Sequence, residues 1–371
     1  MNIIQYVRAF GKKKFSDLPF NEIDALIFSE LAYINFDLSI KEMDFVTLNQ
    51  LVIEDKKKFY YGSVDASKNR RLVEAMIGTK RFGDIKIGFC RSHYDENIYT
   101  QFFAMTIIMP NHQGFISYRG TDTSILGWKE DLYLTYRDSM PSQERAVNYI
   151  KEAATLFKGN FYIGGHSKGG NLAIYTALNM GEKLEKRLIR AYSFDGPGFE
   201  QDITELESFK RIETKLEKFL TTHDMIGVVY NRAKNPKIVY SNGILLGGHD
   251  PFYWSVNRYK ITFTYSKDRS SFSRKSEEAM MNWLKNESPK AKQLAVQVIC
   301  DIVGASKTIY DVLLNASRII SNRKSIFKGY SFRQKEEAKE IFKKLGKYYL
   351  AAYSPKRYLM NKKKKEVVKA E

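Results

Sequence analysis

The stretch that decides the fold is Phe161-Tyr162-Ile163-Gly164-Gly165-His166-Ser167-Lys168-Gly169-Gly170-Asn171-Leu172-Ala173. A short apolar strand pattern runs into a Gly-x-Ser-x-Gly turn, 165–169, and an apolar helical pattern follows at once. Between a strand and a helix, this turn is a nucleophile elbow, a sharp bend that exposes the serine hydroxyl. The bend leaves no room for neighbouring side chains, and the helix N-terminus offers free N–H groups to an oxyanion. A plain strand–helix turn or a phosphate-binding loop would share the glycines, but the flanks favour the elbow, with Ser167 as nucleophile.

The base that accompanies such a serine is expected downstream of it, because the chain order of this type of site is nucleophile, acid, histidine. Of the five histidines, only His223 and His249 follow Ser167. His249 lies in the Gly-rich stretch 247–250, and a loop position lets an imidazole reach a serine. His223 directly follows a strand pattern. We therefore expect His249 to be the base.

Two aspartates are candidates for the acid that orients the imidazole. Asp195 follows the strand pattern 190–194 and opens a Gly-Pro-Gly turn, and Asp224 comes shortly after the strand pattern 218–222. Both lie at the carboxyl ends of predicted parallel strands, where open α/β sheets build their sites. The residues alone leave the choice open, and the aspartate that is not the acid would be an ordinary turn-former.

An oxyanion hole is expected from a strand further upstream. The pattern 115–118 runs into a turn that ends at Thr121. The backbone N–H groups of Thr121 and Lys168 would hold the oxyanion, each contributing about 3 kcal/mol. The Thr121 hydroxyl would add a donor, and Asp131 would hold the Thr121 side chain in place.

With these residues the chain resembles the class 3 lipases of the α/β-hydrolase superfamily and, more closely, a bacterial lipase-like group of unknown function, the Mbeg-like proteins. The resemblance covers about residues 17–285 and is carried by the segments 20–26, 118–131, 164–173, 194–199 and 249–252. It implies an α/β-hydrolase fold, Ser167 as nucleophile, His249 as base and Thr121 as oxyanion residue. The implied reaction is hydrolysis of an ester by a serine hydrolase, on a small-molecule or lipid substrate. The aromatic stretch 252–254 would suit an acyl chain. The sequence contains no residue spacing typical of metal ligands, and we expect no cofactor.

This sequence departs from the class 3 pattern at two points. Lys168 stands where those lipases usually carry leucine, and the spacing from Thr121 to Trp128 is one residue longer. The class 3 pattern puts the acid at Asp224, whereas the Mbeg-like group characteristically has an acidic residue at the position of Asp195. The resemblance therefore gives a slight preference to Asp224.

Alternating strand and helix patterns indicate a mainly parallel sheet with flanking helices. Strands are expected at about 86–89, 101–109, 114–118, 190–194, 217–222, 237–240 and 259–265, the last two as a hairpin or a cap. Helices are expected at about 21–35, 142–157, 276–285 and 333–352, with a long helix after Pro289 whose apolar stripe reaches Ile309, Leu313, Ala316 and Ile320.

Composition narrows the class of protein. Hydrophobic residues make up 43% of the 371 residues, enough for a sizeable core, and the two cysteines imply no disulfide framework. The N-terminal twenty residues lack the apolar core of a signal peptide, and no 18-residue apolar run predicts a transmembrane helix. We expect a cytoplasmic protein, with peripheral membrane attachment as an option.

The net charge of +18 is unevenly distributed, because residues 290–371 hold 20 Lys and Arg against 7 Asp and Glu. This asymmetry predicts two domains, a hydrolase domain over 1–288 and a basic α-helical extension over 289–371. The favoured interpretation is a helical hairpin docking on the hydrolase. An alternative is a surface for anionic membrane or an acidic partner, supported by the lysine run 362–365, on a module that is catalytically silent. Nucleic acid is a weaker candidate, since no recognised motif accompanies the charge.

Overall fold

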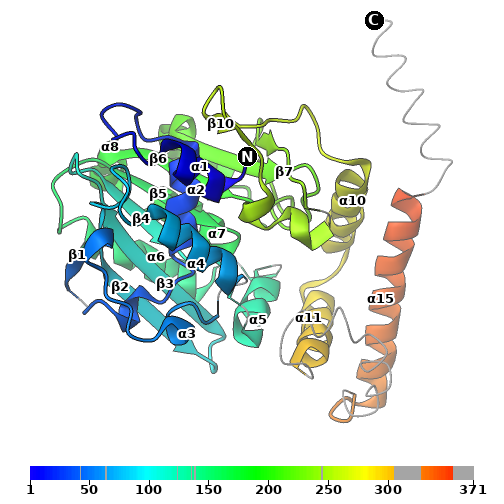
Figure 1. Cartoon of the computed structure of the whole chain (residues 1–371). Coiled ribbons are helices and arrows are strands. Elements are labelled where there is room, and N and C mark those ends of the chain that lie inside the picture. Colours follow the sequence, from blue (N-terminus) through cyan, green and yellow to red (C-terminus); the bar gives the residue numbers. More distant parts are fainter. Residues whose placement is uncertain are drawn as a thin grey trace, which may run out of the picture. The chain divides into compact units, whose positions relative to one another are not determined.

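The computed structural model of the chain describes residues 1–41, 43–62, 65–122, 124–134, 136–137, 139–243, 245–304 and 327–353, without the side chains of 125, 245, 246 and 302–304. The chain divides into two compact units, Met1–Arg269 and Ser270–Glu371 (Figure 1). The stripe residues 309–320 and the lysine run 362–365 lie outside the described residues. Within the described part, no helix combines the length and the hydropathy that crossing a membrane requires.

An eight-stranded sheet forms the centre of the first unit, and its strands lie side by side in their order along the chain. The strands are β1 (Phe45–Thr47), β2 (Lys86–Asp95), β3 (Thr100–Ile108), β4 (Gly114–Tyr118), β5 (Phe161–His166), β6 (Leu188–Phe194), β7 (Leu216–Thr221) and β8 (Lys237–Val239). Pairing is antiparallel from β1 to β4 and parallel from β4 to β8. The predicted fold class, an α/β-hydrolase fold with a mainly parallel sheet and flanking helices, is confirmed.

The helices that connect the parallel strands cover one face of the sheet. They are α5 (Ile125–Tyr133), α6 (Pro141–Ala153), α7 (Lys168–Asn179), α8 (Glu182–Arg187) and α9 (Glu207–Ile212), with the 3-10 turns η3 (Ile203–Glu205) and η4 (Glu213–Lys215). Parallel crossovers are almost always right-handed, and every crossover here moves the chain in the same direction across the sheet. The crossover helices therefore gather on one side, and residues of α6, α7 and α9 share one buried cluster.

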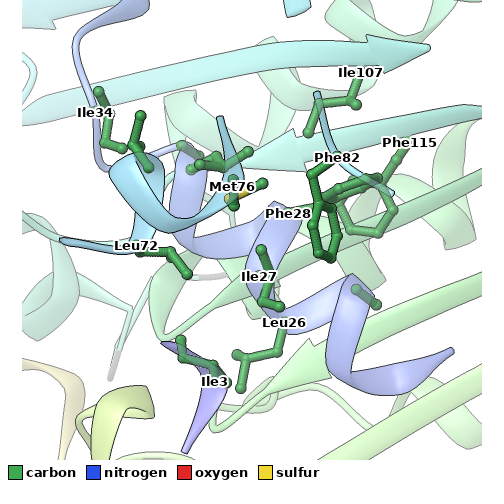
Figure 2. Close-up of a cluster of buried hydrophobic side chains, with 14 of the residues drawn as sticks. Ile3, Leu26, Ile27, Phe28, Ile34, Leu72, Met76, Phe82, Ile107 and Phe115 are labelled. Atoms are coloured by element: carbon green, nitrogen blue, oxygen red, sulfur yellow. The ribbon is translucent and has the colours of Figure 1, made fainter. Parts of the chain in front are cut away.

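The opposite face would remain bare without helices from the N-terminal part of the chain. These are α1 (Ile3–Phe10), α2 (Glu22–Leu31), α3 (Lys56–Phe59) and α4 (Ala66–Met76). Figure 2 shows Leu26, Ile27 and Phe28 of α2 packed among side chains of α1, α4 and the sheet. Alternate residues of β4 serve the two faces, since Phe115 packs with α2 and Ile116 packs in the cluster of α6 and α7.

The segments expected as a hairpin or a cap lie side by side in the structure. Val239 and Tyr265 form an antiparallel bridge, and the N–H groups of Tyr240 and Ser266 donate at 2.8 Å to Thr264 and Ile238. β8 pairs parallel with β7, which extends the main sheet and buries Val239 in the core. A separate two-stranded sheet follows, formed by β9 (Val256–Asn257) and β10 (Thr262–Phe263). The remaining short turns are η1 (Phe36–Leu38), η2 (Leu48–Gln50), η5 (Leu245–Gly248) and η6 (Pro251–Tyr253).

The second unit is helical in its described part, with α10 (Ser271–Asn286), α11 (Pro289–Gly304) and α15 (Phe332–Ala352). Helix α15 packs on both α10 and α11. The hydroxyl groups of Ser276 and Tyr353 are hydrogen-bonded at 3.2 Å, and Lys344 Nζ lies 3.2 Å from Glu287 Oε1. These contacts tie α10 to α15, so the unit begins at Ser270, ahead of the charge-based boundary at 288.

Candidate active site

Ser167 lies at the bend between β5 and α7, as the Gly-x-Ser-x-Gly pattern predicts. Its backbone has φ 57° and ψ −130°, a conformation that non-glycine residues adopt only where the surroundings enforce it. The Ser167 N–H donates to the carbonyl of Phe194 at 2.9 Å, which fixes the bend against β6. The side chain makes no capping hydrogen bond to α7, so capping does not engage the hydroxyl.

Steric crowding explains the glycines around Ser167. A Cβ on Gly169 would lie 2.1 Å from the carbonyl oxygen of Tyr118, and a Cβ on Gly165 would lie 2.3 Å from backbone atoms of Gly169. Both distances are far below a van der Waals contact, and the obstructing atoms are backbone. Only glycine at these two positions lets β5, α7 and the end of β4 approach so closely.

The structure brings His249 and Asp195 together. His249 Nδ1 lies 2.6 Å from Asp195 Oδ2. Asp195 follows β6 directly and is fully buried, with a positive φ of 53° like that of Ser167. A Cβ on Gly196 would lie 2.7 Å from the carbonyl oxygen of Ser167, so the turn that carries Asp195 abuts the elbow. Burial raises the pKa of Asp195 to about 6 and lowers the pKa of His249, which favours a neutral imidazole.

Asp224, the other acid candidate, lies behind this pair. Its Oδ1 accepts the backbone N–H groups of Ile226 at 2.7 Å and Gly227 at 2.8 Å. Its side chain is also hydrogen-bonded to that of Asp195. The aspartate that contacts the imidazole is therefore Asp195, whereas the resemblance gave a slight preference to Asp224. Both aspartates end neighbouring parallel strands, and the one on β6 meets the loop of His249.

His166, which sequence reasoning overlooked, ties the loop of His249 to the elbow. His166 Nε2 lies 2.9 Å from the carbonyl oxygen of His249, and the two rings are 4.4 Å apart between centroids. Burial lowers the pKa of His166 well below its usual value, so the ring is neutral. A carbonyl only accepts, so Nε2 carries the proton and Nδ1 is an acceptor. The Tyr33 hydroxyl lies 3.2 Å from Nδ1 and 3.3 Å from the His166 carbonyl, and it donates between these two acceptors. The place of His166 directly before Ser167 was the only signal in the sequence.

The predicted oxyanion residues lie at the end of β4 and the start of α7. Among the described residues, no acceptor pairs with the backbone N–H of Thr121 or Lys168. The Thr121 hydroxyl donates to Asp131 Oδ2 at 2.5 Å, as the sequence suggested. A Cβ on the adjoining Gly120 would lie 2.5 Å from the carbonyl oxygen of His166, which places this turn against the elbow. Burial raises the pKa of Asp131 to about 6.

Lys168 directs its charge into the protein interior. Its side chain is 1% exposed, and its ammonium group lies 2.5 Å from Glu130 Oε2. It also donates to the Gln101 carbonyl at 2.7 Å and to Gln101 Oε1 at 3.0 Å. The cation beside the nucleophile is therefore compensated by α5 and β3. Glu130 was not singled out from the sequence, although it directly precedes Asp131.

Ser167 and His249 are not joined by a hydrogen bond: within the described part of the chain, no imidazole reaches the Ser167 hydroxyl. Hydrogen bonds of this kind often tighten only when substrate binds. His223, the rejected base, is half-buried, and a Cβ on Gly248 would lie 3.0 Å from its Cβ.

Comparison with known proteins places the chain in a family. The sequence profile of the Mbeg1-like family matches residues 76–301, which is more than half of the chain. Among solved structures, the crystal structure of M37 lipase is similar with a TM-score of 0.37 and 15% identity, over 57% of this chain and 70% of that chain. No curated protein matches. The chain belongs to the Mbeg1-like family.

Proposed function

We propose that this protein is a serine hydrolase that cleaves an ester through an acyl-enzyme formed on Ser167. The observation that carries the proposal is the 2.6 Å contact between His249 Nδ1 and Asp195, built against a strained serine at a strand–helix bend. Fold and family together point to a hydrolase-type function. A nucleophile, a base oriented by a buried acid and two N–H groups that pair with no acceptor in the described part of the chain are the parts that acyl transfer requires.

In this mechanism Ser167 Oγ attacks the ester carbonyl carbon while its proton passes to His249 Nε2. The negative charge that develops on the carbonyl oxygen is held by the N–H groups of Thr121 and Lys168. Asp195 accepts from Nδ1 and stabilises the imidazolium. Collapse of the tetrahedral intermediate breaks the C–O bond of the ester, and the leaving alcohol takes the proton from His249. A water molecule then attacks the acyl-enzyme while His249 accepts its proton. The acid leaves, and the proton returns from His249 to Ser167.

The aromatic residues near His249 give no measure of an acyl chain. Phe252 and Trp254 pack into the main core, and only Tyr253 is exposed. The proposal therefore specifies an ester bond and leaves the acyl length to experiment.

Labelling with a fluorophosphonate probe tests the proposal directly. The parent protein should react with the probe and hydrolyse p-nitrophenyl esters, and Ser167→Ala should abolish both. Ser193→Ala on the adjoining strand is the matched control, because this buried serine lies outside the predicted machinery. His249→Ala should lower turnover by several orders of magnitude, whereas His223→Ala should do much less. Equal labelling of Ser167→Ala and the parent would show that Ser167 is not the nucleophile.

A further inference from the structure

Two buried carboxyl groups face each other behind the imidazole of His249. Asp195 and Asp224 are both fully buried and are hydrogen-bonded to each other through their side chains. A Cβ on Gly227 would lie 2.8 Å from Asp195 Oδ1 and equally 2.8 Å from Asp224 Oδ2. These two oxygens thus lie around one small space, which a glycine leaves open. Two carboxylates cannot hydrogen-bond to each other unless one of them carries a proton.

The remaining oxygens are already engaged in a pattern that assigns the proton. Asp195 Oδ2 faces His249 Nδ1. Asp195 Oδ1 forms no hydrogen bond with an N–H or hydroxyl of the described residues by distance and angle, although the Thr221 N–H also favours the charged form of Asp195. Asp224 Oδ1 accepts two backbone N–H groups, as the carbonyl oxygen of a carboxylic acid does. Asp224 Oδ2 is then the atom that would carry the proton, and it lies beside the same Gly227 Cβ position as Asp195 Oδ1.

The charges around the pair agree with one negative charge. Lys218 of β7 is half-buried beside the pair and donates to the Gly196 carbonyl. The charge of Arg269 also acts on Asp195, and the charges of Asp250 and Asp131 act on His249. Burial strongly disfavours two adjacent anions, and the pKa of Asp224 is raised well above its usual value, first by burial and then by Asp195. Lys218 and Arg269 are both only half-buried, so they offset two fully buried anions poorly, and a single negative charge on the pair is favoured.

We infer that Asp224 is a neutral carboxylic acid that donates its proton in a hydrogen bond to Asp195 Oδ1 and thereby positions Asp195 against His249. This role rests on the proposed function of the site. Asp224 is a positioning residue that acts through Asp195, and its proton stays in place while the serine proton moves to His249. The side chains then form a chain of hydrogen bonds. Two backbone N–H groups donate to Asp224, Asp224 donates to Asp195, and Asp195 accepts from the imidazole of His249.

The decisive experiment applies the same change to both aspartates and measures hydrolysis of a p-nitrophenyl ester. Asp195→Asn removes the required charge and should lower kcat about 10³- to 10⁴-fold. Asp224→Asn keeps a neutral donor and should lower kcat about ten-fold or less, whereas Asp224→Ala removes the donor and should cost more than Asp224→Asn. In Asp224→Ala, the acid limb of the pH–rate profile should move to higher pH, because Asp195 loses a hydrogen bond to its charged form. Equal losses in Asp224→Asn and Asp195→Asn would overturn the inference.

Infrared spectroscopy on protein with ¹³C-labelled aspartate separates this inference from the proposed function. At pH 7 the C=O stretch of a protonated aspartic acid should be present in the parent, retained in Asp195→Asn and diminished in Asp224→Asn. An unchanged band in Asp224→Asn, or its loss in Asp195→Asn alone, would put the proton elsewhere. If no variant or parent hydrolyses an ester, the proposed function fails, and the infrared band still decides where the proton resides.

Discussion

Lys168 follows the nucleophile directly in the chain, but its charged group contacts α5 and β3 in the interior. The side chains of Lys168 and Glu130 are 1% and 0% exposed, so neither charge is solvated by water. The lysine in place of the leucine usual in class 3 lipases is thus one half of a buried ion pair. Its backbone N–H stays available for an oxyanion, which separates the structural role of the side chain from the expected role of the backbone.

Replacing Lys168 by leucine should therefore destabilise the protein, although leucine is the usual residue at this position in related lipases. Lys168→Leu strands Glu130 as an uncompensated buried charge, and breaking such a pair costs about 3–5 kcal/mol. The double variant Lys168→Leu/Glu130→Leu should lose less stability than Lys168→Leu alone, since both charges are then absent. Urea unfolding at neutral pH measures both, and simple additivity of the two single changes would contradict the buried-pair explanation.

Asp131 gives the stability of the protein a dependence on pH. Its pKa is raised to about 6 by burial, so between about pH 4 and pH 6 the folded state holds a proton that the unfolded state has released. The contribution of this group is fully present below pH 4 and is lost as the pH rises through about 6. Asp131→Asn retains an acceptor for Thr121 and should be more stable than the parent at pH 7 by about 1–3 kcal/mol. Thermal unfolding at pH 4 and pH 7 tests this, and an equal difference at both pH values would count against it.

The sequence was enough to nominate the candidate site residues whose spacing or position along the chain is distinctive. Ser167 lies inside a turn motif, and the choice of His249 rested on its Gly-rich loop. The choice between Asp195 and Asp224 depended on which strand end the loop of His249 meets, and that is a tertiary fact. His166 and Glu130 were overlooked because their partners, a backbone carbonyl and a lysine 38 residues away, form no local pattern.

Among the elements, strands were predictable where apolar runs were bounded by turns, and helices were predictable where one face was apolar. Helix α2 was expected to have one apolar face, but every residue from Ile23 to Leu31 is buried, because the helix lies between the sheet and other helices. Helices α1 and α4 were not predicted. The parallel pairing of β8 with β7 was also missed, since a three-residue strand carries too little pattern to predict both of its neighbours, whereas its antiparallel bridge to Tyr265 agrees with the expected hairpin.

The close approach of β4, β5 and α7 predicts which glycines tolerate a methyl group. Gly169→Ala would place its Cβ 2.1 Å from a backbone oxygen and should destabilise the fold by about 1–3 kcal/mol or more. Gly247→Ala is the control, because nothing lies within 4 Å of the added atom. A lower melting temperature for Gly169→Ala, with little change for Gly247→Ala, is the expected result. Equal melting temperatures would mean that the elbow relaxes without cost.

For the whole molecule, the structure and the charge distribution suggest different places to divide the chain. Both buried clusters of the first unit are built from residues between Ile3 and Phe263, which favours a boundary after Arg269. The predicted boundary at 288 follows the onset of the basic region. The difference lies in α10, which has little net charge and packs on α15.

A chain ending at Arg269 should fold and unfold cooperatively, because it retains both clusters. A chain ending at Ser288 keeps α10 without α11 and α15, so proteases should trim it back toward residue 269. Limited proteolysis with mass spectrometry compares the two, and a folded 1–288 beside an unfolded 1–269 would establish the charge-based boundary.

The same chains test the membrane hypothesis: the full chain should co-sediment with anionic vesicles at low salt and release at high salt, and 1–269 should bind far less.

The strand order of the sheet also bears on synthesis. Each strand pairs with the one made just before it, so the sheet can grow by one edge as the ribosome releases the chain. Thr121, Ser167, Asp195 and His249 emerge in that order, each near the end of a strand or beyond it. A nascent chain then presents a folded elbow well before it presents a base. If the protein is the hydrolase proposed above, its activity begins only when the loop after β8 has left the exit tunnel, and a truncated translation product is partly folded and chemically inert.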